Sequence, residues 1–331
     1  MTRCAVVGAG AWGTALSDLL GRNGHDVKIW AYEWDVVEAI NRSHENRRFL
    51  KGSKLDSHVT ACADIAEALD GADMVALATP SHVLRSIVRA AKSSFRPGVP
   101  VVVATKGIET ETLALMTEVA ASELPDSTII ALSGPSFAAE VVNRQPTAVV
   151  VASLEDDAAR AAQATFSSSY FRTYTLSDVT GVEIGGALKN VIAVATGIAE
   201  GLGLGFNARA ALITRGLAEM TRLGTRLGAD PMTLSGLAGL GDLVLTCTGS
   251  LSRNRAVGFD VGRGASLDEV LAGRETVAEG VVTTRSARAL AERENVEMPI
   301  VEAVYRVLFE NTPARDAIGA LMSRELRSET D

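Results

Sequence analysis

Three glycines near the N-terminus constrain this chain more than any other feature. The apolar segment 4–7 predicts a strand, and the segment 14–20 predicts a helix. The turn between them carries Gly8, Gly10 and Gly13. In such a unit the first glycine permits a tight turn, the second lets the backbone approach a pyrophosphate, and the third lets the helix pack closely on the strand. Because backbone N–H groups at a helix N-terminus face phosphates, the turn favours a dinucleotide site over a purely structural turn.

The next predicted strand, 27–30, supports the dinucleotide interpretation, because Glu33 follows it about 20 residues beyond the last glycine. A carboxylate there accepts hydrogen bonds from a ribose 2′-hydroxyl and repels a 2′-phosphate. We therefore hypothesise that NAD(H) is preferred to NADP(H). The arginines of the neighbouring basic segment keep NADP(H) open as the alternative, and they are Arg42, Arg47 and Arg48.

Composition excludes several functional classes. The length of 331 residues predicts two domains, and a net charge of −8 with both signs interspersed provides no basic face for nucleic acid. Three cysteines and four histidines show no metal-ligand spacing, so we expect reduced thiols and no metal. No secretion signal is evident and no uninterrupted apolar stretch reaches about 18 residues, so we expect a cytoplasmic protein without membrane insertion.

Strand and helix patterns alternate up to about residue 180, which predicts a mostly parallel sheet with helices on both faces. The further predicted strands are 59–61, 74–78, 101–104, 128–132, 147–152 and 171–175. The predicted helices are 35–41, 83–92, 113–123 and 155–166. Ligands of such a sheet bind beyond the carboxyl ends of its strands. This rule selects the segments 79–81, 105–107 and 133–136 as candidate site loops.

Strand patterns stop after residue 180, and the chain continues as helices. The predicted helices are 186–200, 208–227, 267–272, 281–294 and 300–310. We interpret one face of 208–227 as solvated and ion-paired, since Arg215, Glu219, Arg222 and Arg226 share it. The sequence thus predicts an α/β, Rossmann-like dinucleotide-binding domain over 1–180, followed by an all-α C-terminal domain over 181–331.

The segment 184–199 contains one ionisable side chain, Lys189, among small and aliphatic residues. A helix that is apolar all round is buried, so Lys189 has little access to water unless its end opens into a cleft. Burial lowers the pKa of a lysine toward neutrality and suits it for proton transfer. The alternative is a lysine that extends from the helix start to solvent. Beside a nicotinamide, this amine would exchange a proton with an alcohol or carbonyl oxygen while hydride is transferred.

Other residues suit an anionic substrate. Lys106 follows a predicted strand, and Ser252, Arg253 and Asn254 supply a hydroxyl, a guanidinium and an amide before a further helical segment. The alternatives are an exposed lysine and a capping serine beside a surface arginine. Asp242 either orients and charge-balances Lys189 or caps a helix beginning at residue 243. From the residues alone we expect a dehydrogenase or reductase acting on a small, anionic alcohol or carbonyl.

The chain also resembles the bacterial type of NAD(P)-dependent glycerol-3-phosphate dehydrogenase. The similar segments follow in the family's order over essentially the whole chain, and they are 8–15, 106–109, 132–136, 181–190, 211–216, 239–242, 252–254 and 279–280. The resemblance implies reversible interconversion of sn-glycerol 3-phosphate and dihydroxyacetone phosphate by hydride transfer at C2, which supplies glycerol 3-phosphate for phospholipid synthesis. It leaves open whether the chain forms a homodimer.

The resemblance also implies roles for individual residues. Catalysis falls to Lys189 as general acid/base, with Asp242 and Lys106. Substrate contacts fall to Lys106, Gly134, Ser136, Lys189, Asn190, Asp242, Ser252, Arg253 and Asn254. Cofactor contacts fall to Gly8, Gly10, Ala11, Trp12, Gly13, Glu33, Phe49, Lys106, Ala138, Arg253, Val277 and Glu279.

This chain departs from the family pattern at two of these positions. Many relatives have serine at Ala11 and tyrosine at Phe49, so neither residue offers a hydroxyl to the cofactor here. Two other functions compete with the one implied. A 3-hydroxyacyl or sugar-acid dehydrogenase would need its own catalytic signature, and a nucleotide sensor without catalytic activity would have no reason to bury Lys189 beside Asp242.

Overall fold

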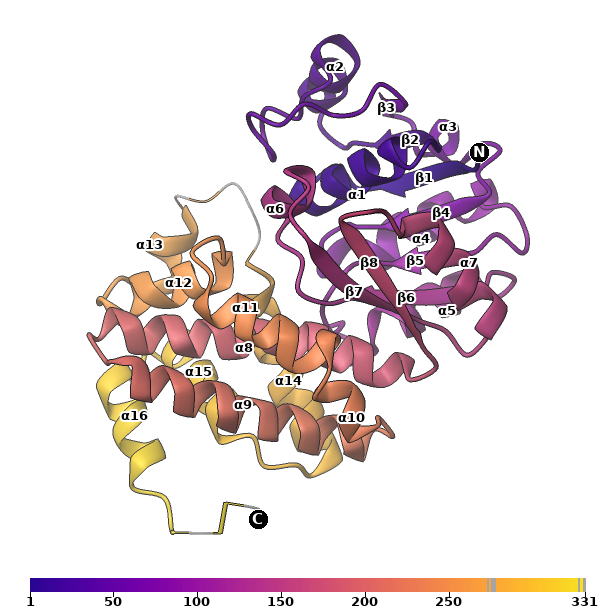
Figure 1. The fold of residues 1–331 in the computed structure, drawn as a ribbon. Coiled ribbons are helices and arrows are strands. Elements are labelled where there is room, and N and C mark those ends of the chain that lie inside the picture. Colours follow the sequence, from indigo (N-terminus) through magenta and orange to yellow (C-terminus); the bar gives the residue numbers. More distant parts are fainter. Residues whose placement is uncertain (273, 275–277, 327, 330–331) are drawn as a thin grey trace.

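In the computed structural model, all residues are described except 273, 275–277, 327 and 330–331. Figure 1 shows two halves, a sheet flanked by helices and a group of helices with the long helix α8 (Val179–Gly201) running through it. The α/β class of the first half and the helical class of the second are both as the sequence predicts.

Eight strands of the described chain form one sheet, in the order β3-β2-β1-β4-β5-β6-β7-β8. Neighbouring strands are parallel except β6 and β7. The strands are β1 (Arg3–Val7), β2 (Asp26–Trp30), β3 (Val59–Cys62), β4 (Met74–Leu77), β5 (Val101–Val103), β6 (Ile129–Ser133), β7 (Thr147–Ala152) and β8 (Phe171–Leu176). Each predicted strand corresponds to an observed strand, and their ends differ by at most one residue.

Helices cover both faces of this sheet because alternate strand residues face opposite sides. Cys4 and Val6 lie in one core with α1, whereas Ala5 and Val7 lie in the other with α4 and α5. The helices of this half are α1 (Ala11–Arg22), α2 (Trp34–Ser43), α3 (Ile65–Leu69), η1 (Ser81–Val83), α4 (Leu84–Ala91), η2 (Lys92–Ser94), α5 (Met116–Glu123), α6 (Ala138–Val142) and α7 (Asp156–Phe166). The sequence did not predict α3 and α6, because five residues are too few to show helical periodicity.

The second half is helical throughout its described residues. Its elements are α8, α9 (Phe206–Arg226), α10 (Pro231–Leu234), the π-helix η3 (Leu237–Gly241), α11 (Asp242–Thr248), α12 (Arg253–Gly262), α13 (Leu267–Ala272), α14 (Glu279–Glu294), α15 (Pro299–Phe309) and α16 (Ala314–Met322). The sequence did not predict the short α10, η3 or α16. Helix α8 begins seven residues earlier than predicted, because its first two turns contain glycines that weaken a sequence-based assignment.

Every residue of α8 from Gly181 to Ala199 is buried, as its apolar composition predicts. Glycines allow its closest neighbour, α12, to approach backbone to backbone. A Cβ at Gly197 would lie 2.0 Å from the Arg255 carbonyl oxygen, and one at Gly258 would lie 2.1 Å from that of Val194. Among the described helices α8 is long and apolar enough to cross a membrane, although Glu183 and Lys189 interrupt its apolar run. Its complete burial is typical of the core helix of a soluble protein.

One prediction about α9 is wrong. The sequence assigned Glu219 to a solvated face, but this side chain is 2% exposed. Its carboxylate accepts the backbone N–H of Ile300 at 2.7 Å and that of Val301 at 3.3 Å. It therefore occupies the positive N-terminus of α15. Helical spacing alone could not distinguish an anion that caps another helix from one that pairs with arginines on its own helix.

The two halves meet between β8, which ends at Leu176, and α8, which begins at Val179. The predicted division at 180/181 therefore lies inside the first turn of α8. Asp178 caps this turn by accepting the N–H of Gly181 at 2.8 Å. The division of the chain into two units that fold separately remains a prediction.

Candidate active site

The glycine turn has the geometry that its spacing predicts. Gly8 has φ 114°, and a Cβ there would lie 2.9 Å from the Ala78 carbonyl carbon. A Cβ at Gly13 would lie 1.9 Å from the Gly8 carbonyl oxygen, so any side chain would push α1 away from the strand. A Cβ at Gly10 would have no atom within 4 Å, and no side chain caps α1. The backbone N–H groups at the start of α1 are thus accessible to an anion.

Asn46 fixes the basic loop to this turn. Its Nδ2 donates to the Ala9 carbonyl oxygen and to Thr14 Oγ1, both at 2.8 Å, and its Oδ1 accepts the N–H of Phe49 at 3.0 Å. Asn46 is fully buried. Sequence reasoning missed this residue, because an asparagine in a polar loop gives no signal of burial.

The residues after β2 lie at the surface near this turn. Glu33 is half-buried and precedes α2, while Tyr32 and Trp34 on either side of it are exposed. The arginines of the basic segment are paired with carboxylates. Arg42 contacts Glu38 at 2.8 Å, Arg47 contacts Glu45 at 3.5 Å, and Arg48 contacts Asp35 at 3.6 Å.

Two lysines and one aspartate, from α8, α11 and the loop after β5, form a cluster at the junction of the two halves. Lys189 Nζ on α8 lies 2.6 Å from Asp242 Oδ1, and Lys106 Nζ, after β5, lies 2.5 Å from Asp242 Oδ2. Lys189 also donates to Thr246 Oγ1 at 2.8 Å. Lys189 is 7% exposed, so the alternative in which it extends to solvent is wrong, as is that of a freely exposed Lys106.

The charges of the cluster shift its pKa values. Burial lowers the pKa of Lys189 to about 8, with repulsion from Lys106 in the same direction and attraction to Asp242 opposing both. Burial acts to raise the pKa of Asp242, but the two ammonium groups outweigh it and hold that pKa below its ordinary value. The arrangement contains an amine that can gain or lose a proton near neutral pH, beside a carboxylate that stays charged.

Two adjacent glycines on α8 allow this cluster to form. A Cβ at Gly185 would lie 2.4 Å from the Ala238 carbonyl oxygen in η3, and one at Gly186 would lie 2.7 Å from Ser133 Oγ on β6. The π-helix η3 leads directly into α11, which Asp242 begins, so close packing of η3 on α8 brings Asp242 to Lys189. The N-cap of α11 is Gly241, and the alternative role of Asp242 as a helix cap is therefore wrong.

The segment 252–254 forms the start of α12. Ser252 caps the helix by accepting the N–H of Arg255 at 3.2 Å, so the capping alternative is correct for this serine. Asn254 Nδ2 donates to Asn190 Oδ1 at 2.8 Å, and Asn254 Oδ1 accepts the N–H of Gly280 at 2.9 Å. The bond between the two amides ties Asn190, which follows Lys189 on α8, to the start of α12. Arg253 is exposed, although desolvation of its guanidinium lowers its pKa and the nearby Glu279 carboxylate opposes this shift.

The loop after β6 approaches the cluster through its backbone. Gly134, with φ 134°, presents its carbonyl oxygen to Lys106 Nζ at 3.2 Å and to Ser136 Oγ at 3.0 Å. A side chain at Gly134 would clash with β7, since a Cβ would lie 2.9 Å from Val149 Cα. Ala138 begins α6 and is half-buried.

Glu279 joins the two halves of the molecule. Its carboxylate accepts the Ser81 N–H at 3.1 Å and the Ser81 hydroxyl at 2.5 Å, just beyond β4. Burial raises the pKa of Glu279. Gly107 packs here too, because a Cβ at this position would lie 2.6 Å from Ser81 Cβ. Val277 lies outside the described residues.

The predicted residues therefore fall into two groups. One surrounds the glycine turn and contains Gly8, Gly10, Ala11, Trp12, Gly13, Glu33 and Phe49. The other lies where strand ends meet α8, α11, α12 and α14. The indole N–H of Trp12 is buried and has no partner among the described residues. In the part of the chain that the structure describes, no group of three histidine, cysteine or acidic side chains could hold a metal ion.

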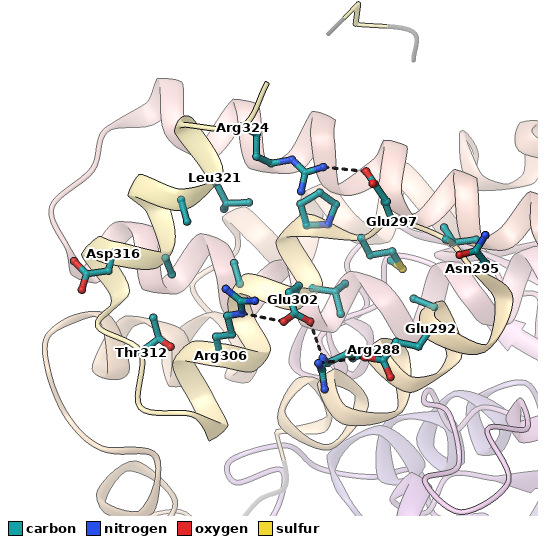
Figure 2. A pocket seen from close by; sticks show the side chains of 18 residues that line it. Arg288, Glu292, Asn295, Glu297, Glu302, Arg306, Thr312, Asp316, Leu321 and Arg324 are labelled. Carbon is teal, nitrogen blue, oxygen red and sulfur yellow. Dashed lines mark hydrogen bonds and ion pairs between the residues drawn. The ribbon is translucent and has the colours of Figure 1, made fainter. Parts of the chain in front are cut away.

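A pocket of about 770 Å³ lies elsewhere, between the end of α14 and helices α15 and α16, and no predicted site residue lines it. Figure 2 shows Glu302 between Arg288 and Arg306, and Arg324 paired with Glu297. The three arginines labelled in this pocket thus already have carboxylate partners.

Comparison with known proteins supports the resemblance inferred from sequence. The family model for the NAD-dependent glycerol-3-phosphate dehydrogenase N-terminus matches residues 3–159, and the model for the C-terminus of the same enzyme matches residues 178–319. A glycerol-3-phosphate dehydrogenase [NAD(P)+] of Syntrophotalea carbinolica is 53% identical over 329 residues, which cover 98% of this chain and 99% of the relative. That of Geobacter sulfurreducens is 54% identical over 330 residues, covering 99% and 98%.

Solved structures agree with the sequence comparisons. A glycerol-3-phosphate dehydrogenase of Coxiella burnetii superposes with a TM-score of 0.94 at 38% identity, covering 98% of this chain and 99% of that one. Both halves of the chain, and their arrangement, thus match one family. The chain belongs to the NAD-dependent glycerol-3-phosphate dehydrogenase family of NAD(P)-dependent oxidoreductases.

Proposed function

We propose that this protein interconverts sn-glycerol 3-phosphate and dihydroxyacetone phosphate, with Lys189 as the general acid/base. The observation that carries the proposal is the buried Asp242 carboxylate that contacts both Lys189 and Lys106, in a chain that matches this family over both halves. We further propose that it acts in the cytoplasm and supplies glycerol 3-phosphate for phospholipid synthesis.

The residues around α1 fit a dinucleotide. The open side of Gly10 and the uncapped N-terminus of α1 suit a pyrophosphate, which Ala11 and Trp12 would contact through their backbone. Lys106, Ala138 and Glu279 lie toward the carboxyl ends of the strands, where the nicotinamide end would be held. When bound, the cofactor supplies or accepts the hydride at C2 of the substrate.

The cluster provides the accompanying proton. In reduction, the Lys189 ammonium donates a proton to the C2 oxygen as the carbonyl becomes an alcohol. In oxidation, the neutral amine of Lys189 takes the hydroxyl proton as the carbonyl forms. Asp242 stabilises the charged form of Lys189, and Lys106 adds a second positive charge near the oxygen.

The start of α12 suits the substrate phosphate. Arg253 is an exposed residue, and its guanidinium suits two-point contact with phosphate oxygens. Ser252 and Asn254 flank it, and Asn254 uses only one of its two Nδ2 hydrogens on Asn190. Gly134, Ser136 and Asn190 complete the proposed substrate contacts.

The direct test is NADH oxidation by the purified protein with dihydroxyacetone phosphate as substrate. We expect turnover with this substrate and little with dihydroxyacetone, the matched control that lacks the phosphate. A folded protein that binds NADH but oxidises none with dihydroxyacetone phosphate would contradict the proposal and favour a nucleotide sensor.

We also propose a preference for NAD(H), based on Glu33. Its carboxylate follows β2 where a ribose 2′-hydroxyl would lie, and the nearby Arg42, Arg47 and Arg48 are each paired with an acid. We expect kcat/KM to be higher for NADH than for NADPH. Glu33→Ala should lower the ratio of kcat/KM for NADH to kcat/KM for NADPH by about tenfold, which corresponds to roughly one charge-assisted hydrogen bond. Glu111→Ala, an exposed acid that pairs with none of these arginines, is the control. A higher kcat/KM for NADPH in the wild type would refute the preference.

A further inference from the structure

Strands β5 and β6 separate close to the lysine cluster. Their pairing ends at Val103 and Ala131, whereas β6 continues to Ser133, which pairs with Val150 on its other side. Helix α8 closes the space that opens between the strands. A Cβ at Gly186 would lie 2.7 Å from Ser133 Oγ and 3.5 Å from Lys106 Cγ and Cδ, so the serine hydroxyl and the lysine stem both adjoin this point.

A small cavity occupies this separation. Its volume is about 10 Å³, and its lining includes Lys106, Ser133, Glu183 and Gly186. One water molecule requires roughly 10–15 Å³ of such volume together with polar partners. Ser133 is 3% exposed, and its hydroxyl has no hydrogen-bond partner among the described residues. A buried hydroxyl without a protein partner beside a cavity of this size indicates a site for water.

Glu183 is a second polar residue in the cavity lining. It is 8% exposed, and its carboxylate accepts the Thr117 N–H at 2.9 Å and the Thr117 hydroxyl. A carboxylate has about four lone-pair sites, so these bonds and a third from the Met116 backbone leave some acceptor capacity. Burial, with the nearby Glu118 adding to it, raises the pKa of Glu183 to about 7. A water molecule in the cavity would lessen the cost of burying this group.

We propose that this cavity binds one water molecule, hydrogen-bonded to Ser133, which connects Glu183 on α8 with the loop that carries Lys106. Ser133 and Glu183 are then positioning residues for Lys106, a role that rests on the proposed function. Lys106 Nζ is held by Asp242 and by the Gly134 carbonyl oxygen, while the stem of its side chain borders the cavity. The water molecule fills the space beside the Lys106 stem, which limits the movement of that side chain and keeps its ammonium directed at Asp242.

A crystal structure at a resolution that shows ordered water tests the binding site itself. We expect a density peak in the cavity within about 2.7–3.2 Å of Ser133 Oγ. A Ser133 hydroxyl bonded directly to a protein atom, with no peak in the cavity, would overturn the proposal. This result does not depend on turnover, so it separates failure of the water site from failure of the proposed reaction.

Kinetics of Ser133→Ala and Glu183→Gln test the positioning role. We expect each to lower kcat/KM for dihydroxyacetone phosphate by roughly 3- to 10-fold, the range for one hydrogen bond, with the KM for NADH unchanged. Because both residues act through one water molecule, the loss of kcat/KM in the double variant should not exceed that of the single variant with the larger loss. Thr173→Val on β8 also removes a buried hydroxyl that has no partner among the described residues, and it should leave kcat/KM unchanged.

Two outcomes of these kinetics would overturn the positioning role. One is a Ser133→Ala variant that loses thermal stability but keeps wild-type kcat/KM, which is the behaviour of a merely structural residue. The other is a double variant whose loss equals the product of the single losses, because independent effects do not share a water molecule.

Discussion

At the scale of single residues, the site depends on how charged side chains neutralise one another where water is excluded. Asp242 contacts two lysines, so the cluster carries one net positive charge when both are protonated. Removal of water makes these interactions stronger than they would be at the surface. Arg253 differs, because it is exposed and its guanidinium forms no ion pair among the described side chains. Since it also precedes Asn254, which bonds to Asn190 next to Lys189, Arg253 is the cation that we propose meets the substrate anion.

Replacement of Arg253 tests this assignment. We expect Arg253→Ala to lower kcat/KM for dihydroxyacetone phosphate by a factor that corresponds to about 1.5 to 3 kcal/mol, the value of a charged hydrogen bond. Steady-state kinetics of Arg253→Ala and of Arg263→Ala, an exposed arginine just beyond α12, provide the comparison. Equal kcat/KM values for the two variants would remove Arg253 from the substrate site.

At the scale of elements, helix ends carry much of the organisation. The start of α1 is left uncapped, whereas carboxylates from other helices occupy the N-termini of α5 and α15. The carboxylates of Glu183 and Glu219 stabilise the packing of segments distant in the chain, because a helix dipole favours a negative charge at the N-terminus of the helix. Only the first of these three termini is free to bind an external anion.

Glu219 makes stability depend on pH. Burial, against hydrogen bonds from Ile300 and Val301, raises its pKa to about 7, above the ordinary value of 4.5. The folded protein therefore binds more protons than the unfolded chain between these two pH values, and the free energy of unfolding falls as pH rises through that window. We expect Glu219→Gln to reduce this fall by about 1 to 3 kcal/mol.

Urea denaturation at several pH values between 4.5 and 7.5 measures the effect of Glu219→Gln, with the exposed Glu111→Gln as the control. Glu183 shifts stability in the same direction, so part of the pH dependence will remain in the variant. An identical pH dependence in wild type and Glu219→Gln would contradict the assignment.

The sequence predicts elements better than it predicts contacts between them. All strands follow from apolar runs bounded by turn residues, and Gly8 and Gly13 follow from a local spacing rule. The burial of Lys189 follows from the composition of its own helix. The position of Asn46, the bond between Asn190 and Asn254, and the capping role of Glu219 depend on segments far apart in the chain. Local patterns carry no information about such tertiary partners.

At the scale of the whole molecule, the cluster exists only because both halves contribute to it. Lys106 comes from the sheet, while Lys189 and Asp242 come from the helices, and Glu279 reaches back to Ser81 beside β4. The glycine turn lies on the sheet half, so a bound dinucleotide would extend from α1 toward this junction. Activity should thus depend on the arrangement of the two halves as much as on any side chain.

The most direct test of this account is the pH dependence of kcat in wild type and Lys189→Ala. Because the proposed reduction uses the Lys189 ammonium as its proton donor, wild-type kcat for dihydroxyacetone phosphate should decline as pH rises through about 8. We expect Lys189→Ala to lower kcat by roughly 10²- to 10⁴-fold, to abolish this decline and to leave NADH affinity unchanged. A variant that keeps wild-type kcat, or the same decline near pH 8, would contradict the account.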